Sequence, residues 1–155
     1  MTKTMDSDMS NEDLVHTKTV FRRHSKGPVM FNGCSPSGDV IIIDNTSLVR
    51  PYDLTGWYIE RETDSQPTLR YTFEDKFCIP PLTTIELWSS TAIPTSTAAD
   101  PEHQHSPESL EKQQQQSYVT IKTQLLTWNS ARQWSVNRLF DCNGHERANF
   151  SHQLL

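Results

Sequence analysis

Residues that could act as nucleophiles, bases or metal ligands are present in this chain, but their spacing forms no recognisable catalytic pattern. Six histidines suggest metal binding at first. However, His103 and His105 lie in a low-complexity stretch, where no rigid neighbours could orient a metal ligand. The serines form no G-x-S-x-G elbow, and neither a P-loop nor a dinucleotide-binding glycine motif occurs. We therefore expect no enzymatic activity, catalytic residue, metal, cofactor or small-molecule substrate.

The acidic residues and the cysteines also favour structural roles. Asp75 and Asp141 stand in turn-like sequences, where aspartate commonly accepts hydrogen bonds from the backbone. Cys34, Cys78 and Cys142 are an odd set without CxxC spacing. In a reducing compartment this pattern indicates free thiols and argues against zinc ligands or a disulfide framework.

Length, charge and hydropathy limit the class of protein. The 155 residues are enough for one domain, and a hydrophobic content of 34% is low for a globular chain, so part of it should lie outside the core. The net charge of -5 argues against a protein that mainly neutralises phosphates. The one basic cluster, "FRRHSKG" at 21–27, is expected to be a solvated flank before the first strand. No signal peptide or membrane-spanning run is visible, so we expect an intracellular protein without a membrane partner.

Elements able to position functional side chains are short and alternate apolar with polar residues, which is the pattern of an all-β fold. Residues 29–32 and 40–44 flank a turn that contains Pro36 and Gly38, so they predict an opening hairpin. The run "VIII" at 40–43 is apolar on both faces and indicates a strand that is covered on both sides or lies centrally in a sheet.

A second hairpin is predicted from 57–61 and 68–73. Gly56 lacks a Cβ atom and can make a sharp turn that delivers Trp57 into the core. We expect Tyr58, Glu60 and Arg61 to face solvent. Further strands are predicted at 83–88 and in "SYVTIKTQLLTW", "VNRLF" and "HERANF". The predicted core residues are Trp57, Ile59, Leu69, Tyr71, Phe73, Ile85 and Leu87.

Two segments are expected to lie outside the folded domain. Residues 1–20 form a disordered N-terminal segment, and about 91–117 form a disordered insertion rich in Pro, Ser, Thr and Gln. The insertion, with a Ser-Pro step at Ser106, could be an inert spacer or carry a regulated binding motif. The remaining domain, 21–152, has the size of an immunoglobulin-like β-sandwich of about seven to nine strands.

The order of "SKGPVMF", "GDVIIIDNTS", "DLTGWYIER", "LRYTF", "KFCIPPLTTIELWSS" and "NGHERA" resembles the lamin tail domain. This is the immunoglobulin-like domain that follows the coiled-coil rod in nuclear lamins and in invertebrate cytoplasmic intermediate-filament proteins. The sequence departs from that pattern in four respects. No glycine follows the late tryptophan in "TWNSARQW", a glycine is replaced within "IPPLTT", the insertion is much longer than the loop that the family implies, and no heptads of a rod are present.

The resemblance implies a non-catalytic structural module that binds filament-associated or lamin-associated protein partners through sheet edges and loops. Cytoplasmic intermediate filaments are favoured over the nuclear lamina as its location. The alternative is a weak chromatin or DNA-binding module that uses the basic entry segment. Candidate partner-binding residues are Arg22, Arg23, Lys26, Tyr58 and Arg61.

Overall fold

The computed structural model describes residues 18–92 and 116–155. The disordered segment predicted at 1–20 therefore lies outside the described residues except for its last three. The insertion predicted at about 91–117 also lies outside them except at its two ends, and so do His103, His105 and Ser106. Strands begin at Thr19 and end at Leu154, two residues beyond each predicted end of the domain.

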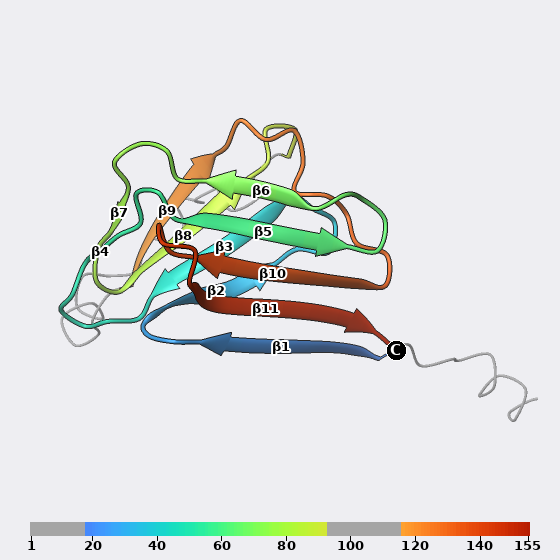
Figure 1. Cartoon of the computed structure of the whole chain (residues 1–155), viewed down its shortest axis with the longest axis horizontal. Helices are drawn as coiled ribbons and strands as arrows, with labels where there is room; N and C mark the ends of the chain where they lie inside the picture. Colours follow the sequence, from blue (N-terminus) through green and yellow to red (C-terminus); the bar gives the residue numbers. More distant parts are fainter. Residues whose placement is uncertain (1–17, 93–115) are drawn as a thin grey trace, which may run out of the picture.

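The described residues form an all-β sandwich, as predicted. One layer is a five-stranded antiparallel sheet that begins and ends with the edge strands β1 and β6. Figure 1 shows the strands of this sheet side by side across the view, with β1 at the lower edge. In spatial order its strands are β1 (Thr19–Ser25), β11 (Glu146–Leu154), β10 (Trp134–Phe140), β5 (Tyr58–Thr63) and β6 (Leu69–Thr72).

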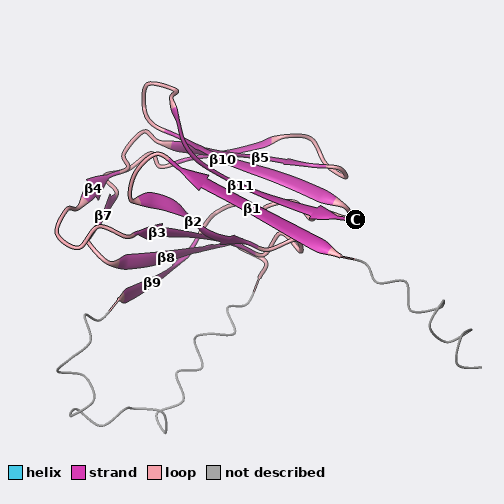
Figure 2. Ribbon diagram, turned by 90° about the horizontal axis from the view of Figure 1, so that it is seen from below, coloured by secondary structure: helices cyan, strands magenta, loops and turns pink. Residues whose placement is uncertain are grey.

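The second layer is a four-stranded sheet that packs against the first, and Figure 2 shows the two layers edge-on. Its last two strands run parallel, so the connection between them starts and finishes at opposite ends of the sheet. A two-stranded ribbon, β4 (Tyr52–Asp53) with β7 (Cys78–Ile79), lies at one end. In order, the second sheet contains β2 (Val29–Cys34), β3 (Val40–Asn45), β8 (Thr83–Trp88) and β9 (Ser117–Lys122).

The count of eleven strands in the described residues exceeds the prediction of about seven to nine. Both predicted hairpins form, since β2 pairs with β3 and β5 pairs with β6. The run "VIII" lies in β3, which is central between β2 and β8; Ile41 and Ile43 are buried, while Val40 and Ile42 are partly buried. The additional strands are β1 and the two-residue strands β4 and β7.

The core fills the space between the two sheets. Ile59 and Leu87 are fully buried, and Trp57, Phe73 and Ile85 are nearly so. Leu69 and Tyr71, which were also predicted in the core, are partly buried and pack against it from the edge strand β6. Further members of the core cluster are Val29, Phe31, Cys34, Ile41, Ile43, Leu54, Ile79, Trp128, Leu139, Ala148 and Phe150.

Gly56 makes the turn that the sequence predicts at the entry to β5. Its φ of +81° lies in the left-handed region that favours glycine, and its N–H donates to the Phe73 carbonyl at 2.8 Å. The next residue, Trp57, accepts a hydrogen bond at its carbonyl from the Phe73 N–H at 2.9 Å and places its ring in the core. Full burial of a tryptophan contributes about 4–6 kcal/mol as an upper bound. This residue therefore anchors the start of the second hairpin.

Two residues of the described chain other than glycine have a positive φ. Leu82, just before β8, has a φ of 50°, and Asn129, just after the buried Trp128, has a φ of 70°. Asparagine tolerates this conformation better than most residues do, because its short amide can bond locally. Leu82 stands in "IPPLTT" and Asn129 in "TWNSARQW", so both positive φ values occur in stretches without a glycine.

Candidate functional site

Strand β1 is the outer edge of the five-stranded sheet and presents unpaired backbone groups. It pairs antiparallel with β11, from Thr19 opposite Leu154 to Ser25 opposite Ala148. The Lys26 amide bonds to Arg147, so the even-numbered residues of this strand direct their N–H and C=O groups toward β11. Those of Thr19, Phe21, Arg23 and Ser25 therefore point to the open side. Within the described residues no other strand pairs with that side.

The outer face of β1 is basic. Arg22 and His24 are exposed, as is Lys26 just after the strand, and none of the three forms an ion pair within the described residues. The sequence-based expectation that "FRRHSKG" forms a flank before the first strand is wrong, because these residues are most of the first strand itself. The strand is polar since it is an edge, which conceals it from a search for apolar alternation.

The inner face of β1 carries an apolar ring next to a groove. Phe21 is 55% exposed, yet its ring lies 5.8 Å from that of Phe150 and 5.7 Å from that of His152, measured between centroids. Arg23 also faces inward, where its Nη1 donates to the Phe31 carbonyl of β2 at 3.4 Å. A groove of about 590 Å³ runs between β1 and β2, lined by Phe21, Arg23, Asn32, Gly33, Ile42 and Phe150 among others.

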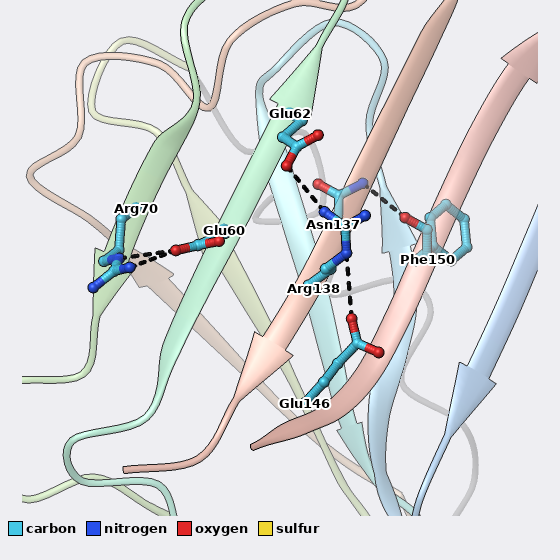
Figure 3. A network of polar contacts seen from close by, with 7 residues as sticks. All are labelled: Glu60, Glu62, Arg70, Asn137, Arg138, Glu146 and Phe150. Atoms are coloured by element: carbon cyan, nitrogen blue, oxygen red, sulfur yellow. Dashed lines mark hydrogen bonds and ion pairs between the residues drawn. The ribbon is translucent and has the colours of Figure 1, made fainter. Parts of the chain in front are cut away.

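Tyr58, another predicted partner-binding residue, is half-buried in contacts across the outer face of the same sheet. Its ring stacks on Phe140 at 4.9 Å, and the Arg70 guanidinium lies 4.3 Å above it. Arg70 also pairs with Glu60 at 2.5 Å. Figure 3 shows this pair beside a second group, in which Arg138 bridges Glu62 and Glu146.

Arg61 does not face solvent, which corrects the expectation from the sequence. Its side chain is fully buried and donates to the Asn129 carbonyl, the Ser35 carbonyl and Asn137 Oδ1 at 2.9–3.1 Å. The physical reason is alternation: the strand that places Ile59 inside also places Arg61 inside, two residues later. This arginine is a structural crosslink between β5 and three distant segments.

The buried Arg61 charge alters its neighbours. Burial lowers the pKa of Arg61 and raises the pKa of the Cys34 thiol, although the guanidinium opposes the latter shift. Burial, and then repulsion from Arg61, lower the pKa of His152, while Asp64 opposes this. The Cys34 thiol is therefore a neutral core group and not a reactive nucleophile.

The other side chains that could act in catalysis or metal binding have structural roles or lie far from one another. Asp141 Oδ1 accepts hydrogen bonds from the Asn143 and His145 amides, which lower its pKa and make it a turn former. Cys78 and Cys142 are exposed free thiols. Within the described ranges, no three His, Cys, Asp or Glu side chains gather closely enough to hold a metal ion. No helix among them is long and apolar enough to cross a membrane.

The structure brings only part of the predicted partner-binding set together. Arg22, Arg23 and Lys26 lie on or beside β1, although Arg23 faces the groove and the other two face outward. Tyr58 and Arg61 lie on β5, which β11 and β10 separate from β1. Reasoning from sequence missed Phe21 and His24, because "VFRRHS" does not alternate apolar and polar residues and so carries no signal of a strand with two distinct faces.

Comparison with known proteins relates about half of this chain to intermediate filament proteins. No family model matches it. Intermediate filament proteins ifa-3 and ifa-2 of Caenorhabditis elegans are 26% and 25% identical to it over 73 residues, or 47% of this chain. A non-neuronal cytoplasmic intermediate filament protein of Cornu aspersum is 32% identical over 80 residues, or 50% of this chain. The matches span only 13–14% of the length of these relatives.

Proposed function

We propose that this chain is a non-catalytic structural and protein-interaction module of the intermediate-filament type. The similarity of about half of it to intermediate filament proteins is the observation that carries the proposal. The all-β sandwich agrees with such a role, because its functional surfaces are sheet edges and faces that other proteins can contact. The edge β1, with its free backbone groups and unpaired cations, is the contact surface that we assign to it.

More narrowly, the domain is proposed to be of the lamin tail kind. The Gly56 turn, the buried Trp57 and the strand that ends at Trp88 support this, together with the positive φ at Leu82 and Asn129. We place the protein in the cytoplasm, because one relative is named as a cytoplasmic intermediate filament protein. The nuclear lamina is the alternative location.

Co-sedimentation with preformed filaments tests the proposal. The purified chain is mixed with filaments of a cytoplasmic intermediate filament protein from the same organism and centrifuged. We expect it to pellet with these filaments in a saturable manner and to stay in the supernatant when it is alone or with actin filaments. Retention in the supernatant with every filament type would contradict the proposal, and preferential pelleting with lamin filaments would move its location to the lamina.

A second candidate function is weak binding of duplex DNA, favoured by the exposed Arg22 and Lys26, which have no ion-pair partner in the described part of the chain. Arg23 contributes less, since it donates to the Phe31 carbonyl. A few cations give only salt-sensitive affinity. Titration with duplex DNA at about 150 mM salt distinguishes DNA binding from the protein-interaction role, because clear binding at that salt favours DNA binding.

A further inference from the structure

We propose that edge strand β1 binds an extended, acidic segment of a partner protein in which acidic and apolar residues alternate. The segment would add to the five-stranded sheet as a sixth strand beside β1. This inference rests on the proposed function, since it names the chemistry of a partner for the edge assigned there.

The backbone of β1 supplies the first requirement, a row of free hydrogen-bonding groups. The N–H and C=O groups of Thr19, Phe21, Arg23 and Ser25 point away from β11. None of these groups forms a backbone hydrogen bond on that side within the described residues. A strand of about seven residues would match the length of β1 and bond to each of them.

The outer face of β1 selects the charge of the incoming strand. Arg22, His24 and Lys26 project from this face at alternate positions, and no ion pair within the described ranges neutralises them. Side chains of paired strands that lie opposite one another on one face interact directly. Every second residue of the partner would therefore face Arg22, His24 and Lys26, and Asp or Glu at those positions complements the charges of Arg22 and Lys26.

The inner face selects apolar residues at the intervening positions. There the partner's side chains would meet the exposed ring of Phe21 and the groove between β1 and β2. Gly33 lines that groove without a side chain, and a Cβ atom there would be in ordinary contact with Ile42 Cδ1 at 3.8 Å. A branched apolar side chain from the partner would cover the Phe21 ring, which is otherwise half in water.

Charge also argues against a second copy of this chain as the occupant. Two β1 strands paired edge to edge would bring their Arg22, His24 and Lys26 columns together, and like charges opposite one another destabilise a strand pair. Among the other edge strands, β9 projects Tyr118, Thr120 and Lys122 and has a single cation. It therefore lacks the column of charge that defines the partner of β1.

Binding of synthetic peptides tests the inference. The probe is a fluorescent ten-residue peptide that alternates Glu and Val, measured by anisotropy at about 50 mM salt, where surface charges are weakly screened. We expect saturable binding, at least roughly tenfold tighter than that of a peptide with the same residues in two blocks. A peptide that alternates Lys and Val should not bind. Equal binding of the alternating and block peptides would overturn the inference, because charge alone would then explain it.

Matched variants locate the site. Reversal of Arg22→Glu with Lys26→Glu should weaken binding by at least about tenfold and allow the Lys-Val peptide to bind instead. The control, Lys76→Glu with Lys122→Glu, makes the same change in net charge at exposed positions away from β1 and should leave affinity unchanged. Equal losses of peptide affinity in the two variants would contradict the assignment of the binding site to β1. Melting temperatures show that each variant is folded.

N-methylation of the peptide distinguishes strand addition from loose adhesion. Methyl groups on the Val amides should abolish binding if the added strand is antiparallel to β1, and methyl groups on the Glu amides if it is parallel. In either case the other methylated peptide keeps its affinity. Equal affinities of the two methylated peptides would contradict binding by strand addition. If filaments co-sediment but no alternating peptide binds, this inference fails and the proposed function stands; if neither occurs, both fail.

Discussion

At the scale of single residues, the unusual side chain of this sandwich is a buried arginine without a carboxylate partner in the described chain. Arg61 donates to two backbone carbonyls and one side-chain amide, so its charge is stabilised by oriented dipoles rather than by an opposite charge. Asn137 in turn donates to the Phe150 carbonyl, as Figure 3 shows. This network joins β5, β10 and β11 to the loops at Ser35 and Asn129.

Arg61→Met should therefore destabilise the fold strongly. The substitution keeps a long apolar side chain but removes every donor, which leaves the Asn129 and Ser35 carbonyls and Asn137 Oδ1 buried without this partner. We expect the free energy of unfolding to fall by about 2–4 kcal/mol, measured by urea denaturation.

Arg70→Met is the matched control for that substitution. Arg70 is exposed, and its ion pair with Glu60 lies on the surface, so the same chemical change should cost less than about 1 kcal/mol. Equal losses for the two variants would show that the buried network does not stabilise the fold.

The placement of Arg61 shows what sequence reasoning about single residues can and cannot supply. The alternation through Trp57 and Ile59 was sufficient to assign Arg61 to the core face. The general rule that arginine is exposed led to the opposite assignment, because the acceptors that make its burial tolerable come from residues 26 to 76 positions away in the chain. Such acceptors are not visible locally.

At the scale of elements, the two hairpins could be predicted from the sequence, but the edge strand β1 could not. β2 with β3 and β5 with β6 have turn residues between strands that each bury one face, which are local signals. Strand β1 is mostly exposed and its partner β11 lies more than 100 residues away, so neither periodicity nor a turn reveals it. The candidate site consequently had to come from the structure, although its cations were noted in the sequence.

The turn between β2 and β3 depends on Gly38. This residue has a φ of +82°, and a Cβ atom there would lie 2.7 Å from the Asn129 carbonyl carbon and 2.9 Å from its oxygen. Both are backbone atoms in the loop that follows the buried Trp128, so they cannot move away cheaply. Gly38→Ala should lower the free energy of unfolding by about 2–4 kcal/mol, as measured by urea denaturation.

Gly33→Ala provides the comparison within the same hairpin. Its φ lies outside the left-handed region and its nearest atom would be an ordinary 3.8 Å away, so we expect a change within about 1 kcal/mol. If Gly38→Ala were equally mild, the close approach of the two loops would not be a constraint on the fold.

At the scale of the whole molecule, the class of fold was predictable because it depends on the sum of many alternating runs. The parallel pairing of β8 with β9 was not, since a long stretch of chain separates them and no local rule fixes the direction of return. The two-residue strands β4 and β7 are too short to leave a periodic signal.

The stability of the whole fold should also depend on pH through His152. Burial chiefly lowers its pKa below the ordinary value of 6.5, so the unfolded chain takes up a proton at a higher pH than the folded chain does. Its contribution to stability is therefore complete above about pH 6.5 and is lost as the pH falls toward the folded-state pKa. The melting temperature should drop between about pH 7 and pH 5.

His152→Phe isolates this effect, because it keeps an aromatic ring against Phe21 without a titrating group. The variant should show a flatter melting profile over the same range. Below about pH 4 both proteins should lose stability alike, since the amides of His145 and Asn143 lower the pKa of Asp141. Parallel profiles above pH 5 would contradict the assignment to His152.

The pairing of β1 with β11 has a consequence for how the domain assembles with time. The two strands stand at opposite ends of the described chain, with Thr19 opposite Leu154, and closing so large a loop is slow compared with forming a hairpin. During synthesis, the β5–β6 and β2–β3 hairpins can form before β11, the pairing partner of β1, has been made. The edge that we assign to partner binding is therefore completed last, and loss of the final strand would leave β1 without its place in the sheet.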